Sequence, residues 1–131
     1  MPHITLDYSP NMETRTNISA LCDTLRRAAI ESGVFPLAGV RVRAFRADHT
    51  SIADGQDIHG YIDIVIRLRE GRDDATKQHA ARAVFDAAER FLAPAMATHS
   101  VALSLELRDM QADLALKAGT IRDHLGTENT Q

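Results

Sequence analysis

The sequence predicts an α+β fold in which two β-α-β units form one sheet and two helices pack on one of its faces. Four segments alternate apolar and polar residues with the period of a strand, and two longer ones repeat apolar residues with the period of a helix. Their order is strand, helix, strand, and then the same again. The halves have similar spacing, with a strand from residue 3 and a helix near 17, then a strand from 61 and a helix near 73. This pattern is typical of a structural repeat.

The first unit begins with residues 3–8, where Ile, Leu and Tyr alternate with His, Thr and Asp. A polar connection leads to Asn17, the predicted N-cap of a helix with apolar residues at helical spacing. Gly33 occupies the position of a residue that ends such a helix. Residues 40–45 alternate again and form the second predicted strand.

The second unit contains the clearest strand, YIDIVIRL at residues 61–68, and a final strand at 101–108. The connection before the strand at 61–68 carries the strongest turn signal of the chain, Asp54-Gly55. One face of these two strands is uniformly apolar. The other is too mixed for a deep core and too apolar for full solvation, so a subunit interface is expected there. The residues of that second face include Val65, Arg67, Ala102 and Ser104.

The helix of the second unit is expected to begin at a cap formed by Asp73 or Asp74. Its predicted apolar stripe comprises Ala81, Val84, Phe85, Ala88, Phe91, Leu92, Ala95 and Met96. Pro94 lies late in this stripe, and because proline removes a helical hydrogen bond, a kink or an early end is expected there. Residues 109–125 are expected to add a short strand or a helical turn.

Length and composition are ordinary for a globular protein, with 131 residues of which 44% are hydrophobic and 25% charged. We expect a single domain over residues 1–125 and a flexible C-terminal tail over 126–131. A net charge of −3 favours neither nucleic acid nor an anionic membrane as a partner. No apolar run is long enough to cross a bilayer and no signal-peptide pattern is visible, so the expected location is the cytoplasm.

Common catalytic motifs are missing from the sequence. It has no G-x-S-x-G elbow, P-loop or G-x-G-x-x-G segment. The six histidines include no pair at the i, i+4 spacing of a helical zinc site. The single cysteine, Cys22, falls within a helical pattern and is expected to be a buried structural thiol. We therefore expect no metal.

Pro2 is unusual because the first strand starts directly behind it. Removal of Met1 would give this strand a free secondary amine at its end. An α-amino group titrates near ~7.7–8.0, and burial or nearby arginines would lower that pKa. A base with a pKa near neutrality suits general acid–base catalysis. The other interpretation is an ordinary chain terminus.

Arginine dominates the basic residues: of 15, only Lys77 and Lys117 are lysine. Arginine binds carboxylates through a planar bidentate fork. Arg41 and Arg43 lie two apart on a predicted strand, so they share a face and are separated by roughly 7 Å. One dicarboxylate would fit between them. A solvated or interface face explains the pair equally well.

Four blocks of the sequence resemble the 5-carboxymethyl-2-hydroxymuconate isomerase family, which belongs to the tautomerase superfamily. These blocks are PHITLDYS, SGVFPLAGVRVRA, IADGQDIHGYIDIVIRLREGR and VALSLEL. The superfamily also contains 4-oxalocrotonate tautomerase and macrophage migration inhibitory factor. The resemblance runs in register from Pro2 to about residue 117. The C-terminal region from residue 113 matches only loosely, and the chain lacks tryptophan.

The resemblance implies a tautomerase-like fold assembled as a homotrimer, with Met1 removed and Pro2 as general base and acid. The proline would move a proton from the 2-hydroxyl of a dienol to a carbon further along the conjugated chain. The implied substrate is an unsaturated hydroxy di- or tricarboxylate from homoprotocatechuate (4-hydroxyphenylacetate) breakdown. Arg41 and Arg72 match the family's carboxylate-binding arginines best, and Arg43 matches as well. No cofactor is implied.

Two alternatives to this function stay open at the level of sequence. A tautomerase-superfamily enzyme can carry out a different reaction, such as decarboxylation, hydration or dehalogenation of small unsaturated acids. A non-catalytic ligand-binding or regulatory module with the order βαββαβ would have the same pattern of elements.

Overall fold

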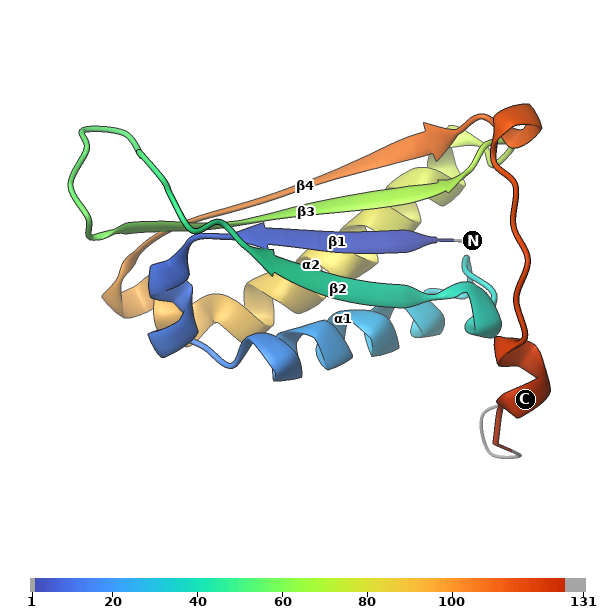
Figure 1. Ribbon diagram of the computed structural model, residues 1–131, viewed down its shortest axis with the longest axis horizontal. Helices are drawn as coiled ribbons and strands as arrows, with labels where there is room; N and C mark the ends of the chain where they lie inside the picture. Colours follow the sequence, from blue (N-terminus) through green and yellow to red (C-terminus); the bar gives the residue numbers. More distant parts are fainter. Residues whose placement is uncertain (1, 127–131) are drawn as a thin grey trace.

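The computed structural model describes residues 2–126 and contains a four-stranded sheet with two helices (Figure 1). The main elements are β1 (His3–Tyr8), α1 (Ile18–Glu31), β2 (Arg41–Arg46), β3 (His59–Arg69), α2 (Asp74–Thr98) and β4 (Ser100–Met110). Short 3-10 helices lie in the connections, at Pro10–Thr14 and Leu37–Gly39, and after β4, at Ala112–Leu114 and Ile121–His124. Met1 and all but the first residue of the predicted tail lie outside the described residues. Among the described residues, no helix has the length and apolar character of a membrane span.

The strands are ordered β2-β1-β3-β4, and this order joins two β-α-β units. β1 and β2 are parallel, and so are β3 and β4, while β1 pairs with β3 in antiparallel orientation. Each helix is the crossover between the two parallel strands of its own unit. Both helices cover the same face of the sheet (Figure 1). The fold class and the order of elements predicted from the sequence are therefore confirmed.

The core lies between this face and the helices. Alternate residues of β1 and β3 are fully buried, as the period-two patterns predict. The helices contribute residues spaced three or four apart, such as Leu21 and Leu25 of α1 and Val84, Ala88 and Leu92 of α2. All of them belong to one cluster, and the partly buried Cys22 packs against it.

The helix termini are stabilised by the side chains that the sequence indicated. Asn17 Oδ1 accepts a hydrogen bond of 2.9 Å from the backbone N–H of Ala20. Asp73, rather than Asp74, caps α2 by accepting from the N–H of Thr76 at 2.8 Å. Gly33 follows α1 with a φ of +76°, the left-handed conformation in which glycine is favoured.

Two details of the predicted second helix are wrong, namely the early end that was one of the two outcomes predicted at Pro94, and the place of Met96 in the apolar stripe. α2 does not end near Pro94 but continues through it to Thr98. Proline in a helix costs about 3 kcal/mol, and burial of Leu92 and Ala95 on either side of it offsets that cost. Met96, assigned to the apolar stripe, is 37% exposed. The C-terminal region forms two 3-10 turns, in agreement with one of the two predicted forms.

Substitution of Gly60 by alanine is expected to destabilise the protein. The new Cβ would lie 2.7 Å from Asn11 Oδ1 and 2.9 Å from Arg15 Nη1. Neither side chain is free to move, because Asn11 donates to the carbonyl of His59 and Arg15 donates to two carbonyls of its own. We expect the free energy of unfolding to fall by about 1–3 kcal/mol in a denaturant titration.

Gly119→Ala is the matched control, because nothing lies within 4 Å of the position where its Cβ would be. Its free energy of unfolding should stay within about 0.5 kcal/mol of the original. Equal stabilities of the two variants would contradict the steric argument at Gly60.

Candidate active site

The topology brings three of the four predicted site residues to one end of the sheet, where strands start or finish. We call this end the Pro2 edge. β1 and β2 start at this edge because they are parallel, and β3 ends there because it is antiparallel to β1. Pro2 precedes β1, Arg41 is the first residue of β2, and Arg72 follows the end of β3. Pro2 and Arg72, which are 70 positions apart in the chain, therefore lie at one end of the molecule.

Pro2 is among the fully buried side chains. The next residue, His3, pairs with Arg41 of β2 on one side and with Arg67 of β3 on the other. Pro2 thus starts a strand in the interior of the sheet, between two neighbours.

A row of basic side chains crosses the sheet at this edge. In register from β2 to β4 it comprises Arg41, His3, Arg67 and Arg108. Because side chains alternate along a strand, this row faces away from the helices, opposite to Ile4. We call it the basic row. The predicted shared face of Arg41 and Arg43 is confirmed, and Arg43 lies one step further along that face.

His3 is held neutral by its surroundings in the basic row. Desolvation by burial lowers its pKa below the ordinary value of 6.5, and the charges of Arg67, Arg43 and Arg41 lower it further. Arg43 Nη1 lies 3.3 Å from His3 Nδ1. Because arginine only donates, Nδ1 must be the unprotonated nitrogen and the proton of the neutral ring is on Nε2. His3 therefore presents an N–H donor without adding a charge.

Arg72 anchors the turn between β3 and α2. Its Nη1 donates to the carbonyl of Arg69 and its Nη2 donates to the carbonyl of Val34, both at 3.3 Å. Two bonds to neutral carbonyls leave the positive charge of Arg72 uncompensated and leave further N–H groups available. The side chain can therefore bridge the turn and an anion at the same time.

The C-terminal strap, residues 115–122, runs past the same end of the sheet (Figure 1). Residues of the strap line a cavity there. This cavity has a volume of about 280 Å³. Arg41 lines it from β2, together with the connection before β2 and with Lys117 and Arg122 from the strap. A smaller cavity of about 60 Å³ lies beside it and is lined by His3, Arg69 and again Lys117. We call them the Arg41 cavity and the His3 cavity. A wider groove between α2 and β4 contains none of the predicted site residues.

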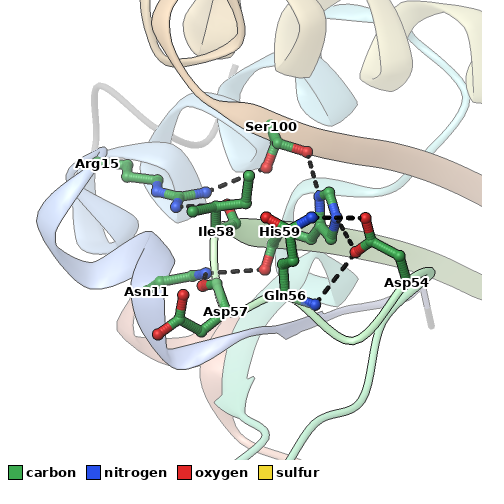
Figure 2. A network of polar contacts seen from close by, with 8 residues as sticks. All are labelled: Asn11, Arg15, Asp54, Gln56, Asp57, Ile58, His59 and Ser100. Atoms are coloured by element: carbon green, nitrogen blue, oxygen red, sulfur yellow. Dashed lines mark hydrogen bonds and ion pairs between the residues drawn. The ribbon is translucent and has the colours of Figure 1, made fainter.

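A second polar cluster lies at the opposite end of the sheet (Figure 2). His59 Nε2 is 2.7 Å from Asp54 Oδ1, and His59 Nδ1 is 2.7 Å from Ser100 Oγ. Although Ser, His and Asp make a catalytic triad elsewhere, these residues line neither cavity at the Pro2 edge. Arg15 adds bonds to the carbonyls of Ile58 and Ser100. The cluster ties the β2–β3 loop to the starts of β3 and β4.

No group of three or more metal-ligating side chains is found in residues 2–126. The chemistry available at the Pro2 edge is instead that of an anion site. It offers several cations, a neutral imidazole and a buried proline within a short stretch of sheet.

Comparisons with known proteins identify the family to which the chain is similar. The family model of 5-carboxymethyl-2-hydroxymuconate isomerase matches residues 2–125. The 5-carboxymethyl-2-hydroxymuconate Delta-isomerase of Escherichia coli is 26% identical over 121 residues, which is 92% of this chain and 96% of that protein.

Solved structures give the same result. A crystal structure of a 5-carboxymethyl-2-hydroxymuconate delta-isomerase matches with a TM-score of 0.88 and 27% identity, covering 95% of this chain and 92% of that one. The isomerase from Deinococcus radiodurans R1 matches with a TM-score of 0.86 and 24% identity, covering 94% and 92%.

The fold also occurs in a fused 4-OT protein solved as a symmetric trimer, with a TM-score of 0.66 and 16% identity, covering 89% of this chain and 94% of that one. At that identity the likeness concerns the fold alone, and it confirms the expected tautomerase-like fold. Since the family match takes in all but the ends of the sequence, the chain belongs to the 5-carboxymethyl-2-hydroxymuconate isomerase family.

Proposed function

We propose that the protein is a cofactor-free tautomerase that ketonises 5-carboxymethyl-2-hydroxymuconate or a similar unsaturated 2-hydroxy di- or tricarboxylate. The observation that carries this proposal is the position of Pro2 at one sheet edge with Arg41 and Arg72. The names of the relatives support the substrate. We assign the reaction to homoprotocatechuate (4-hydroxyphenylacetate) degradation, as the resemblance of the sequence implies.

The reaction begins with a free Pro2 amine, which requires removal of Met1. Burial lowers the pKa of an amine, and so do nearby guanidinium groups. The neutral amine takes the proton of the 2-hydroxyl, the electrons of that O–H bond form the C=O group, and the double bonds shift along the chain. The proline then returns the proton to the carbon at the far end of the conjugated system. One group acts as base and acid in turn, so no cofactor is consumed.

The arginines act on the charges of the substrate. Carboxylates are held by bidentate guanidinium contacts, which fix the reacting atoms relative to Pro2. In the transition state negative charge develops on the 2-oxygen, and cations already in place stabilise it without reorganisation. We assign the carboxylate contacts to Arg41 and Arg72, and a supporting role to Arg43, which bonds to His3.

We further propose that the protein assembles as a homotrimer. The sheet face opposite the helices carries a mixture of apolar and polar residues, and the region after β4 exposes large apolar side chains. Leu116 is 94% exposed and Leu114 is 77% exposed. Burial of such side chains between subunits would stabilise an oligomer. The fused 4-OT protein with this fold is itself a trimer.

Retention of Met1 is expected to abolish most of the activity. The nitrogen of Pro2 would then belong to an amide and have no proton affinity near neutral pH. We expect the protein lacking Met1 to ketonise the dienol about 10²–10⁴-fold faster than a form that retains it. Intact mass identifies the two forms, and the decay of dienol absorbance gives their rates. Pro10→Ala, at the far end of β1, is the control and should be fully active. Equal rates for the two forms would sink the proposed role of Pro2.

Arg41→Ala and Arg72→Ala are expected to lower kcat/KM by about 10²-fold, because each removes a preorganised cation. The free energy of unfolding should change by only about 1 kcal/mol, the usual range for a partly exposed hydrogen bond. Arg90→Ala, an exposed arginine of α2, is the control and should leave both quantities unchanged. Unchanged specific activity in the native fraction of either variant would make that arginine structural.

Light scattering after size exclusion is expected to give three times the chain mass of 14.4 kDa. Leu116→Glu should lower this value, because it puts a charge into the interface. Met96→Glu, on the helix side, should leave it unchanged. A monomeric unmodified protein would contradict the assembly proposed here.

A further inference from the structure

The charged residues that line the Arg41 cavity, within the part of the chain that the structure describes, are all positive. Arg41, Lys117 and Arg122 contribute three cations. The other lining residues are apolar or glycine, namely Pro36, Ala38, Gly39, Ala118, Gly119 and Ile121. Among residues 2–126 no carboxylate lines the cavity, so these walls do not cancel the positive potential inside it. A concave surface of this kind concentrates anions.

Lys117 and Arg122 of the strap lack the hydrogen bonds and ion pairs that most other basic residues form within residues 2–126. Lys77 is paired with Asp109, Arg82 with Asp86, and Arg26 with Asp23. Within residues 2–126, Lys117 and Arg122 take part in no hydrogen bond or ion pair. Holding two such groups beside Arg41 is electrostatically unfavourable in the empty protein. A bound anion would remove this repulsion.

Lys117 links the cavity to the proline. It lines the Arg41 cavity and also the His3 cavity, whose wall includes the residue next to Pro2. An anion held by Lys117 and Arg122 therefore lies next to a cavity whose wall includes the neighbour of Pro2. The Arg41 cavity, at about 280 Å³, lies just below the range of roughly 300–1,000 Å³ of whole small-molecule sites. Its size suits one carboxylate-bearing arm of a larger acid.

We propose that Lys117 and Arg122 are specificity-determining residues that bind the carboxylate of the substrate's carboxymethyl arm. This inference rests on the proposed function and assigns two residues of this chain to one arm of its substrate. Arg41 holds the carboxylate nearer the reacting carbons, and the strap holds the one on the side arm. Arg122 supplies a bidentate fork, and Lys117 supplies a point charge between the two cavities.

The test compares two dienols that differ by one carboxymethyl group, 5-carboxymethyl-2-hydroxymuconate and 2-hydroxymuconate. The variants are Lys117→Gln, Arg122→Gln and the double substitution, which remove charge but keep a polar side chain. We expect the double variant to raise KM for the tricarboxylate by about 10-fold or more, the loss expected for a charged hydrogen bond. Its kcat, and its KM for the dicarboxylate, should stay within about 2-fold. Lys117→Arg, which keeps the charge, should retain the KM for the tricarboxylate. An unchanged ratio of the two KM values in the double variant overturns the proposal.

A binding measurement separates this proposal from the proposed function. Propane-1,2,3-tricarboxylate has no dienol and is not turned over, so calorimetry reports its binding alone. We expect the double variant to bind it at least 10-fold more weakly than the unmodified protein, with Arg90→Ala as the control. If that loss occurs in a protein that does not ketonise dienols, the carboxylate site stands and the tautomerase function fails. If dienols are turned over while tricarboxylate binding is absent or insensitive to the double substitution, the function stands and the role of the strap is wrong.

Discussion

The antiparallel pairing of β1 with β3 is the constraint on which the rest of the structure depends. A β-α-β unit alone has only two strands, and a sheet of two strands is marginally stable. The pairing merges the two units into one four-stranded sheet. It also sets the register that puts His3 between Arg41 and Arg67. A shift by one residue would move every buried isoleucine of β3 to the open face. The burial of Ile62, Ile64 and Ile66 therefore fixes the position of the basic row as well.

The basic row concentrates positive charge in a chain whose net charge is −3. The positive charges of Arg41, Arg67 and Arg108 on neighbouring strands repel one another. The basic row therefore lowers the stability of the folded protein, and folding alone does not explain it. The neutral state of His3 limits this cost, because a fourth charge is kept out of the row. The strong core beneath it, with β1 and β3 buried on the helix side, supplies the stability that tolerates the remaining repulsion.

The fold could be predicted from the sequence further than the site could. Period-two and helical patterns locate all four strands and both helices. An element that is buried on one face carries apolar residues with its own period, and this period is visible in the sequence. The helix does not end early at Pro94, as one of the two predicted outcomes had it. Local helix propensity does not include the stabilisation from burial of Leu92 and Ala95 around the proline. Pro2 and the pair Arg41 and Arg43 were candidates from their residue types and positions, whereas Arg72 was predicted only through the resemblance to the family.

The missed residues depend on contacts that have no local pattern. Arg67 joins the basic row through strand register, and Lys117 and Arg122 reach the Arg41 cavity through the path of an irregular segment. For Arg67 the available signal was a basic residue in register with basic residues of the neighbouring strands. This signal can be recognised only once the strand order and register are known.

The strap has a consequence for how this protein can diversify. It supplies walls to the Arg41 cavity while lying outside the sheet and adding no side chain to the buried core. Replacements there alter the charge and shape of the cavity without disturbing the packing of helices on strands. The charge of the cavity can therefore change through replacements at Lys117 and Arg122 alone, while the packed core, and Leu116 in the proposed subunit interface, stay as they are.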